Sequence, residues 1–376
     1  MNSTTTTTTI SWGSRLGSSF KGIVVGLVMF ILGFPILFWN EGRAVDATKT
    51  NEEGASNVVE ADAATVDPAQ DGKLVHVIGE ATTEDVLKDD TYGVAEKAIA
   101  LRRKVEMYQW VEHEETREEK KLGGKIERTT TYTYAKEWCD APVSSDTFHV
   151  QQPTQVNPPA RCELGRSELR ATTVALGARR LAEGQIRRIG GWTGLKSLYE
   201  PVTTNEFFEI SGTVPEPKVG DVRVTFEIVK APRTITVVAG QRGNTFMAYT
   251  AKSTGSSIDH LLDGAVDAAG VFARAEKGNS IMTWILRLVG FIIMYLGVSK
   301  IFAPLSVLAD VVPAIGSIVS FGTGILSFLI AAPCALATIA VAWVFYRPVL
   351  GISLLAIAGA LVGFAIYKVA TGKKAA

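Results

Sequence analysis

Histidine and cysteine are scarce in this chain of 376 residues, which holds four histidines and three cysteines. The histidines are widely separated, and neither a His–x–x–x–His nor a Cys–x–x–Cys spacing occurs. Zinc sites that can be recognised in a sequence depend on such spacings. The phosphate-binding motif G-x-x-x-x-G-K-[ST] is missing as well. We therefore assign no metal ligand, no cofactor and no catalytic residue, and we expect the protein not to be an enzyme.

Charge is missing from long stretches at both ends of the chain. Gly22–Asn40 contains no charged residue, and the one charged residue in Ser280–Ser299 is Arg287. The stretches 311–346 and 348–367 are also uncharged. A bilayer core of about 30 Å is crossed by about 20 apolar helical residues. The sequence therefore predicts an integral membrane protein, with one apolar helix before a long polar segment and several after it.

The order of these stretches predicts the organisation of the chain. The first one is longer than the core of a signal peptide and lacks a small-residue cleavage site, so we expect a retained signal anchor. Four spans fit the pattern, and five are the alternative. The predicted parts are a disordered cytoplasmic tail at 1–19, transmembrane helices at 20–40, 280–302, 324–346 and 348–368, a soluble domain at 41–279, an interfacial or re-entrant segment at 303–323 and a cytoplasmic tail at 369–376.

Charge is distributed unevenly between these parts. Outside Glu41–Asn279, Asp310 is the single acid. Basic residues precede the first helix and follow the last one, at Arg15, Lys21, Lys368, Lys373 and Lys374. Because lysine and arginine beside membrane helices favour the cytoplasmic side, we expect both termini in the cytoplasm. The net acidic domain then lies in a lumen, the periplasm or the exterior, and it is unsuited to binding nucleic acid.

The polar segment mixes strand and helix patterns. Leu101–Glu112 and Thr129–Trp138 alternate or are rich in β-branched residues, and Gly123-Gly124 between them predicts a long charged hairpin. Apolar residues at helical spacing predict helices at 175–186 and 258–275. Strands in runs with few helices favour an α+β domain. The predicted fold class is a multi-span α-helical membrane protein with a large, strand-rich α+β domain between its first and second membrane helices.

Two kinds of residue at the membrane are candidates for helix packing. The pairs Gly22/Gly26 and Gly359/Gly363 have the small-xxx-small spacing that lets helices approach closely in lipid. Glu41 and Arg347 stand at the membrane edge, where a charge needs a partner, and we predict that they form an ion pair. This pair would hold the first helix against the C-terminal helices.

Cys139 and Cys162 lie in the predicted non-cytoplasmic domain, whereas Cys334 lies in an apolar stretch. In an oxidising compartment the first two thiols can pair, and such a disulfide could stabilise the domain by roughly 3 kcal/mol. Two separate buried thiols are the alternative interpretation.

Several short stretches resemble one protein family. They occur in the family's order and extend from the first apolar helix to the last. They are Asn40–Ala44 (NEGRA), Leu74–Gly79 (LVHVIG), Leu101–Glu112 (LRRKVEMYQWVE), Val219–Phe226 (VGDVRVTF), Ser280–Leu286 and Phe345–Pro348 (FYRP). On these residues the chain resembles the transmembrane protein 43 family, also called LUMA.

The resemblance implies four spans, cytosolic termini and a large lumenal domain. Animal members reside in the endoplasmic reticulum and inner nuclear membrane, self-associate and act with emerin and lamins. Related bacterial proteins imply an inner-membrane location and a role in membrane organisation or stress response. We therefore expect a membrane scaffold that self-associates in the lipid bilayer and contacts other membrane proteins.

Two other classes of function stay open at this point. A transporter or channel subunit would need a polar path through the membrane, for which Arg287, Lys300, Asp310 and Arg347 are available. An enzyme that acts on lipid at the membrane surface would need a pocket built from distant segments.

Overall fold

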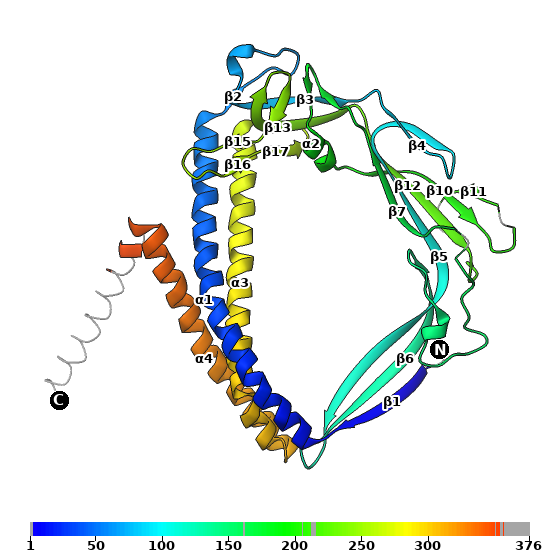
Figure 1. The fold of residues 1–376 in the computed structure, drawn as a ribbon, viewed down its shortest axis with the longest axis vertical. Helices are drawn as coiled ribbons and strands as arrows, with labels where there is room; N and C mark the ends of the chain where they lie inside the picture. The colour runs from blue at the N-terminus through cyan, green and yellow to red at the C-terminus, as the bar shows by residue number, and fades with distance from the viewer. Residues whose placement is uncertain are drawn as a thin grey trace. The chain divides into compact units, whose positions relative to one another are not determined.

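The computed structural model describes residues 3–160, 162–204, 206–211, 216–349, 351–353 and 356. It divides into two compact units. The strand-rich unit consists of Met1–Thr7, Glu52–Arg117 and Thr129–Ala273, and the helical unit consists of Thr8–Asn51, Glu118–Arg128 and Arg274–Ala376. Figure 1 labels the elements of both units.

Among the described residues, three helices are long and apolar enough to cross a membrane: α1 (Trp12–Asn57), α3 (Ala268–Ala309) and α4 (Pro313–Tyr346). They contain the segments 20–40, 280–302 and 324–346, which the sequence predicts as transmembrane helices. Each helix continues beyond its apolar stretch, and α1 with its 46 residues is about 70 Å long. The predicted fourth span at 348–368 lies mostly outside the described residues.

The turn between α3 and α4 is shorter than the sequence predicted. The expected interfacial segment 303–323 is divided between the end of α3, a turn around Asp310 and the start of α4. Pro304 is accommodated inside α3, and Pro313 stands in the first turn of α4. A proline costs little in the first turn, because the N–H that it lacks has no partner there.

The N-terminal tail also differs from the prediction of disorder at 1–19. Strand β1 (Ser3–Ile10) forms at the edge of a sheet, and α1 begins at Trp12. The tail consists mainly of threonine, whose branched Cβ favours the extended backbone. A neighbouring strand edge was sufficient to order it.

The strands form two larger sheets and one small ribbon. The eight-stranded sheet has the order β1-β6-β5-β12-β10-β11, with β4 and β7 also paired to β5, and the seven-stranded sheet has the order β17-β13-β14-β9-β8-β3-β2. Their longest members are β5 (Val94–Lys120), β6 (Ile126–Cys139), β12 (Val222–Lys230), β13 (Arg233–Arg242) and β3 (Leu74–Thr82). The others are β2 (Val59–Glu60), β4 (Val86–Asp89), β7 (Gly165–Arg170), β8 (Ala175–Leu176), β9 (Arg179–Arg180), β10 (Thr193–Glu200), β11 (Phe208–Ile210), β14 (Thr245–Met247), β15 (Tyr249–Thr250), β16 (Ser257–Ile258) and β17 (His260–Asp263).

The predicted hairpin is confirmed, whereas two predicted helices are wrong in part. β5 and β6 are neighbours, and Gly123 and Gly124 turn the chain with φ of 80° and 72°. Residues 175–186 form β8, β9 and the start of the short helix α2 (Glu183–Arg188), and 258–275 contain β17 before α3 begins. Apolar spacing alone did not separate strand from helix there, because these short segments are ordered by pairing within the sheet.

Each unit has its own apolar core. In the strand-rich unit, buried residues of β3 and β13, such as Val77 and Val237, pack with Ile186 of α2. In the helical unit, Leu37 of α1, Met294 of α3 and alanines of α4 form a small cluster. The three long helices are therefore packed against one another, although α1 and α3 are far apart in the sequence.

Candidate functional site

A buried carboxylate lies where α1, α3 and α4 meet. Only 2% of Glu41 is exposed. Arg287 of α3 donates from Nε to Glu41 Oε1 over 2.7 Å and from a terminal guanidinium nitrogen to Oε2 over 2.8 Å. Trp343 of α4 donates from its indole Nε1 to the same Oε2 over 2.8 Å. One acidic side chain thus links all three helices, and the two-pronged arginine contact is the stronger form of such a pair.

Aromatic rings stabilise the arginine in this place. Arg287 lies over the ring of Trp284 at 4.8 Å and near the ring of Trp343 at 5.6 Å. A guanidinium is attracted by the negative face of an indole, and the attraction grows when water is excluded. The cation is therefore held on one side by a carboxylate and on others by aromatic faces.

A second layer of polar contacts joins α1 to α3 next to this pair. Asn40, which has no exposed surface, donates to the carbonyl oxygen of Thr283 over 3.1 Å. Arg43 donates to Asn279 Oδ1 over 3.1 Å and to Thr283 Oγ1 over 2.8 Å. We call Asn40, Glu41, Arg43, Asn279, Thr283, Arg287 and Trp343 together the junction network.

The predicted partner of Glu41 is wrong. Arg287 occupies the carboxylate, and among the described residues Arg347 makes no side-chain ion pair with it. Tyr346 is the residue of α4 that lies against α1 at this point. A Cβ added to Gly42 would lie 2.7 Å from the ring of Tyr346. The ring of Tyr346 also lies 5.2 Å from that of Phe38.

The candidate packing glycines Gly22 and Gly26 differ in what surrounds them. A Cβ on Gly26 would lie 2.5 Å from the carbonyl oxygen of Gly297, so α1 and α3 approach closely at this point. A Cβ on Gly22 would meet no atom of the described chain within 4 Å. Gly359 and Gly363 lie outside the described residues. Only Gly26 is therefore seen at a helix contact.

The candidate disulfide is not present in the described part of the chain. Cys139 and Cys162 are not bonded to each other. Cys162 packs beside another buried apolar cluster of the strand-rich unit, which includes Leu101 and Val224, and Tyr92 packs against the same cluster. Among the described residues no group of three or more His, Cys, Asp or Glu side chains is arranged to hold a metal ion.

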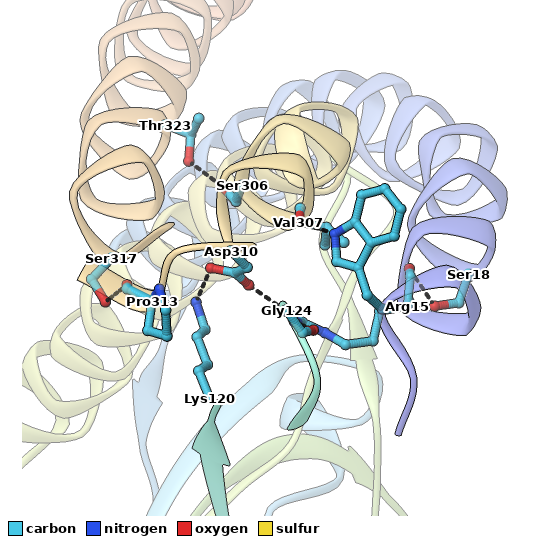
Figure 2. A network of polar contacts seen from close by, with 11 residues as sticks. Arg15, Ser18, Lys120, Gly124, Ser306, Val307, Asp310, Pro313, Ser317 and Thr323 are labelled. Carbon is cyan, nitrogen blue, oxygen red and sulfur yellow. Dashed lines mark hydrogen bonds and ion pairs between the residues drawn. The ribbon is translucent and has the colours of Figure 1, made fainter. Parts of the chain in front are cut away.

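A second buried carboxylate lies at the turn between α3 and α4 (Figure 2). Only 1% of Asp310 is exposed. Lys120, from the tip of the β5–β6 hairpin, donates from Nζ to Asp310 Oδ1 over 2.8 Å, and Arg15 at the start of α1 pairs with the other oxygen. We call these three residues the turn cluster.

Backbone contacts surround the turn cluster. Arg15 also donates to the carbonyl oxygen of Gly124 over 2.6 Å, and Trp12 donates from Nε1 to the carbonyl oxygen of Val307 over 2.8 Å. The N–H of Gly123 donates to the carbonyl oxygen of Val311 over 2.9 Å. The hairpin tip, the start of α1 and the turn are therefore joined by several bonds.

Burial by itself raises the pKa of Asp310, but the hydrogen bonds and charges of Lys120 and Arg15 outweigh it and lower the pKa below the ordinary aspartate value. The carboxyl group is thus held in its ionised form. This contact could not be predicted from local sequence patterns, because Lys120 and Asp310 are 190 positions apart.

Comparison with known proteins shows the family to which the chain belongs. The family model described as Transmembrane protein 43 matches residues 107–348. The chain belongs to the transmembrane protein 43 family. It is 36% identical over 350 residues to Transmembrane protein 43 of Rattus norvegicus. The aligned region covers 89% of this chain and 86% of the relative.

Other members of the transmembrane protein 43 family show a similar extent of likeness. Transmembrane protein 43 of Homo sapiens is 35% identical over 352 residues, with the same shares of 89% and 86%. The Transmembrane protein 43 homolog of Drosophila melanogaster is 29% identical over 363 residues, which are 93% of this chain and 95% of the homolog. No solved structure matches the chain significantly. The region matched by the family model contains Arg287, Asp310 and Trp343, whereas Glu41 precedes it.

Proposed function

We propose that this protein is a non-enzymatic organiser of its membrane, which crosses the bilayer several times and associates with copies of itself and with other membrane proteins. Membership of the transmembrane protein 43 family and three helices of membrane-spanning character support the membrane part of the proposal. The observation that carries the organising role is the junction network. It joins α1, α3 and α4 through buried charge where α1 leads into the strand-rich unit.

A buried, fully partnered ion pair is a means of fixing geometry rather than of catalysis. Both oxygens of Glu41 accept hydrogen bonds from Arg287 and Trp343, and the carboxylate is 2% exposed, so it is poorly placed to act on a substrate. Separating α1 from α3 would leave an uncompensated charge in a low-dielectric surrounding, which is costly. The three helices would therefore move as one body.

Self-association is supported by the outer face of α1. Val24, Val28, Ile31 and Leu32 are each 50–66% exposed in the single chain. In a membrane such a face contacts either lipid or another helix. Gly22 also leaves room for a second helix, because a Cβ at this position would meet no atom of the described chain within 4 Å.

Site-directed cysteine crosslinking tests the self-association in a variant whose three native cysteines are replaced by serine. Val28→Cys, on the outer face, is expected to give disulfide-linked dimers when membranes are oxidised. Leu37→Cys is the matched control, because Leu37 has no exposed surface and packs inside one copy. Monomer alone from both variants, and from lysine-reactive crosslinking of the native chain, would reject the proposal.

The proposed orientation puts the termini in the cytoplasm and residues 41–279 on the opposite side. The turn cluster bears directly on this orientation, since it joins Arg15 to Lys120. The hairpin tip also carries Glu118 and Glu119, and such charges do not reside in hydrocarbon. We therefore propose that the contacts of the hairpin tip with Arg15, Asp310 and Val311 open when α1 and α3 cross the bilayer, together with the pairing of β1 with β6.

An impermeant thiol reagent tests this orientation in sealed vesicles. Ser18→Cys reports on the side of Arg15, and Leu122→Cys reports on the hairpin tip, where 79% of Leu122 is exposed. We expect the two cysteines to be labelled from opposite sides. Labelling of both from one side would contradict the orientation and would mean that the turn cluster stays closed in the membrane.

A further inference from the structure

One buried histidine bonds to two other segments of the strand-rich unit. His76 lies on β3, and 1% of the residue is exposed. Its Nδ1 lies 2.6 Å from Glu60 Oε2, and its Nε2 lies 2.8 Å from the carbonyl oxygen of Val266. Glu60 belongs to β2, which follows α1, and Val266 stands between β17 and α3. We call His76, Glu60 and Val266 together the His76 bridge.

The two hydrogen bonds of His76 need a proton on each ring nitrogen. A neutral imidazole carries one N–H group and donates one hydrogen bond, whereas the imidazolium ion donates two. The carbonyl oxygen of Val266 can only accept, so Nε2 is the donor there. The side chain of Glu60 is 73% exposed, and an exposed glutamate is ionised at neutral pH, so it accepts as well. His76 is therefore doubly protonated when both bonds are formed.

The other three histidines have different surroundings in the part of the chain that the structure describes. His113 contacts Glu137 through Nε2, and His149 contacts a threonine hydroxyl through Nε2, so each uses one ring nitrogen. The ring of His260 meets that of Phe272 edge-on at 6.0 Å, and burial lowers the pKa of His260. His76 is thus the histidine whose contacts depend on both ring protons.

The other titratable groups on the elements around His76 make different contacts. Across the sheet, His76 is opposite Val238 of β13, and Val238 is opposite His260 of β17. The acidic groups are Asp62 and Asp267, which accept from backbone N–H groups, Asp259 and Asp263, which pair with Arg188 and Arg233, and Glu53 of α1, which accepts from the N–H groups of Lys252 and Ser253. Glu80, further along β3, is exposed. Among the described residues, Glu60 is thus the charged side chain in contact with His76.

We propose that the His76 bridge is a pH-dependent contact, which holds β2 to β3 while the ring carries both protons and releases β2 when one is lost. Histidine is the side chain whose charge changes between about pH 5 and 8. The neutral ring keeps its N–H on Val266, because the exposed carboxylate of Glu60 can exchange its contact for water. The stability that Glu60 contributes is therefore present at the acidic end of this range and is lost as the pH rises.

The pairing of β2 with β3 is short. Val59 is opposite Val75 and Glu60 is opposite His76, and the N–H of Ala61 donates to the carbonyl oxygen of His76 over 2.9 Å. Strands in globular proteins usually pair over more residues than this. Loss of the Glu60 contact therefore loosens β2 and uncovers part of the edge of β3. The response is independent of the self-association proposed above, because the whole His76 bridge belongs to the strand-rich unit.

Hydrogen–deuterium exchange of the full-length protein in detergent, measured across a pH series, tests the proposal. Exchange is followed in a peptide that covers residues 58–61 and is corrected for the effect of pH on intrinsic amide exchange. Opening of this segment should increase with pH, by up to about tenfold per pH unit where the ring loses its proton, because one proton is released. His113→Gln is the matched control. It removes an exposed histidine that pairs with a glutamate, and it should leave the response of residues 58–61 unchanged.

Glu60→Gln gives the decisive comparison, and the exposure of this side chain makes the variant compatible with folding. The amide oxygen of glutamine accepts from the protonated ring, and its NH2 group donates to the neutral ring. Residues 58–61 of this variant should therefore stay protected across the whole pH series. The proposal is overturned if protection of the native segment does not change with pH or is lost on acidification. It is also overturned if Glu60→Gln opens with rising pH as the native chain does, or if His113→Gln abolishes the response.

Discussion

The junction network and the turn cluster each bury one carboxylate, but their partners come from different kinds of structure. Glu41 is 2% exposed and Asp310 is 1% exposed. The partners of Glu41 stand on two packed helices. Asp310 is held by Arg15 and by Lys120, whose side chain is 34% exposed and belongs to a hairpin tip. The first carboxylate is released only by separating helices, whereas the second can regain water when a hairpin moves.

The largest effect is expected for Glu41→Ala. The substitution leaves Arg287, whose side chain is 16% exposed, without its counter-charge, and breaking a buried pair typically costs about 3–5 kcal/mol. We expect a marked fall in the thermal unfolding temperature of the detergent-solubilised protein. Arg347→Gln is the control, since Arg347 does not pair with Glu41.

A double variant separates the charge from the packing. If Glu41→Met with Arg287→Met recovers most of the stability lost by Glu41→Ala, the cost arises from the unpaired charge. An unfolding temperature that is unchanged by Glu41→Ala, or is lowered equally by Arg347→Gln, would show that the junction network does not hold the helices together.

A smaller effect is expected for Asp310→Asn. The amide keeps the shape but loses the charge that Lys120 and Arg15 share, and the loss of such a hydrogen-bonded partner costs about 1–3 kcal/mol. Lys120→Met should reproduce part of the loss in detergent. Lys121→Met should not, because Lys121 pairs with exposed glutamates on the hairpin itself. Equal effects of the two lysine variants would contradict a specific bond to Asp310.

The turn cluster should also respond to pH. Since the pKa of Asp310 is lowered in the folded protein, its contribution to stability is present above the ordinary aspartate pKa. It is lost as the pH falls through the lower, folded value. The stability difference between the native chain and Asp310→Asn should therefore shrink on acidification, as measured by unfolding temperature across a pH series. A difference that grows towards acid pH would contradict the ion pair.

Sequence patterns predicted the parts of the fold that depend on local composition. The apolar stretches lie within α1, α3 and α4, and Gly123-Gly124 turns the hairpin as expected. The patterns did not predict which charges meet. Arg287 and Arg347 both lie near an end of a predicted membrane helix. Which of them pairs with Glu41 depends on the helix faces that are in contact, and the structure pairs Glu41 with Arg287.

Contacts between distant segments explain the remaining differences. The sequence predicts Asp310 within an interfacial segment, because no residue near it in the sequence indicates that it pairs with Lys120. The threonines of β1 looked disordered because their pairing partner, β6, comes more than a hundred residues later. Residues 175–186 have helical spacing, yet β8 and β9 form there because a sheet edge provides hydrogen-bond partners.

The smallest expected effect concerns the stretch of α1 between the two clusters, where Gly26 and Gly22 form a matched pair. Gly26→Ala places a methyl group against the carbonyl oxygen of Gly297 and should separate α1 from α3 slightly, at a cost near the low end of the ~1–3 kcal/mol of overpacking. Gly22→Ala meets no described atom and should be neutral or mildly stabilising, because alanine favours the helix. Unfolding temperatures of the two variants would be compared with that of Glu41→Ala. If Gly26→Ala were as harmless as Gly22→Ala, the close approach of α1 and α3 would not extend this far from the junction network, and the two clusters would respond independently to substitution.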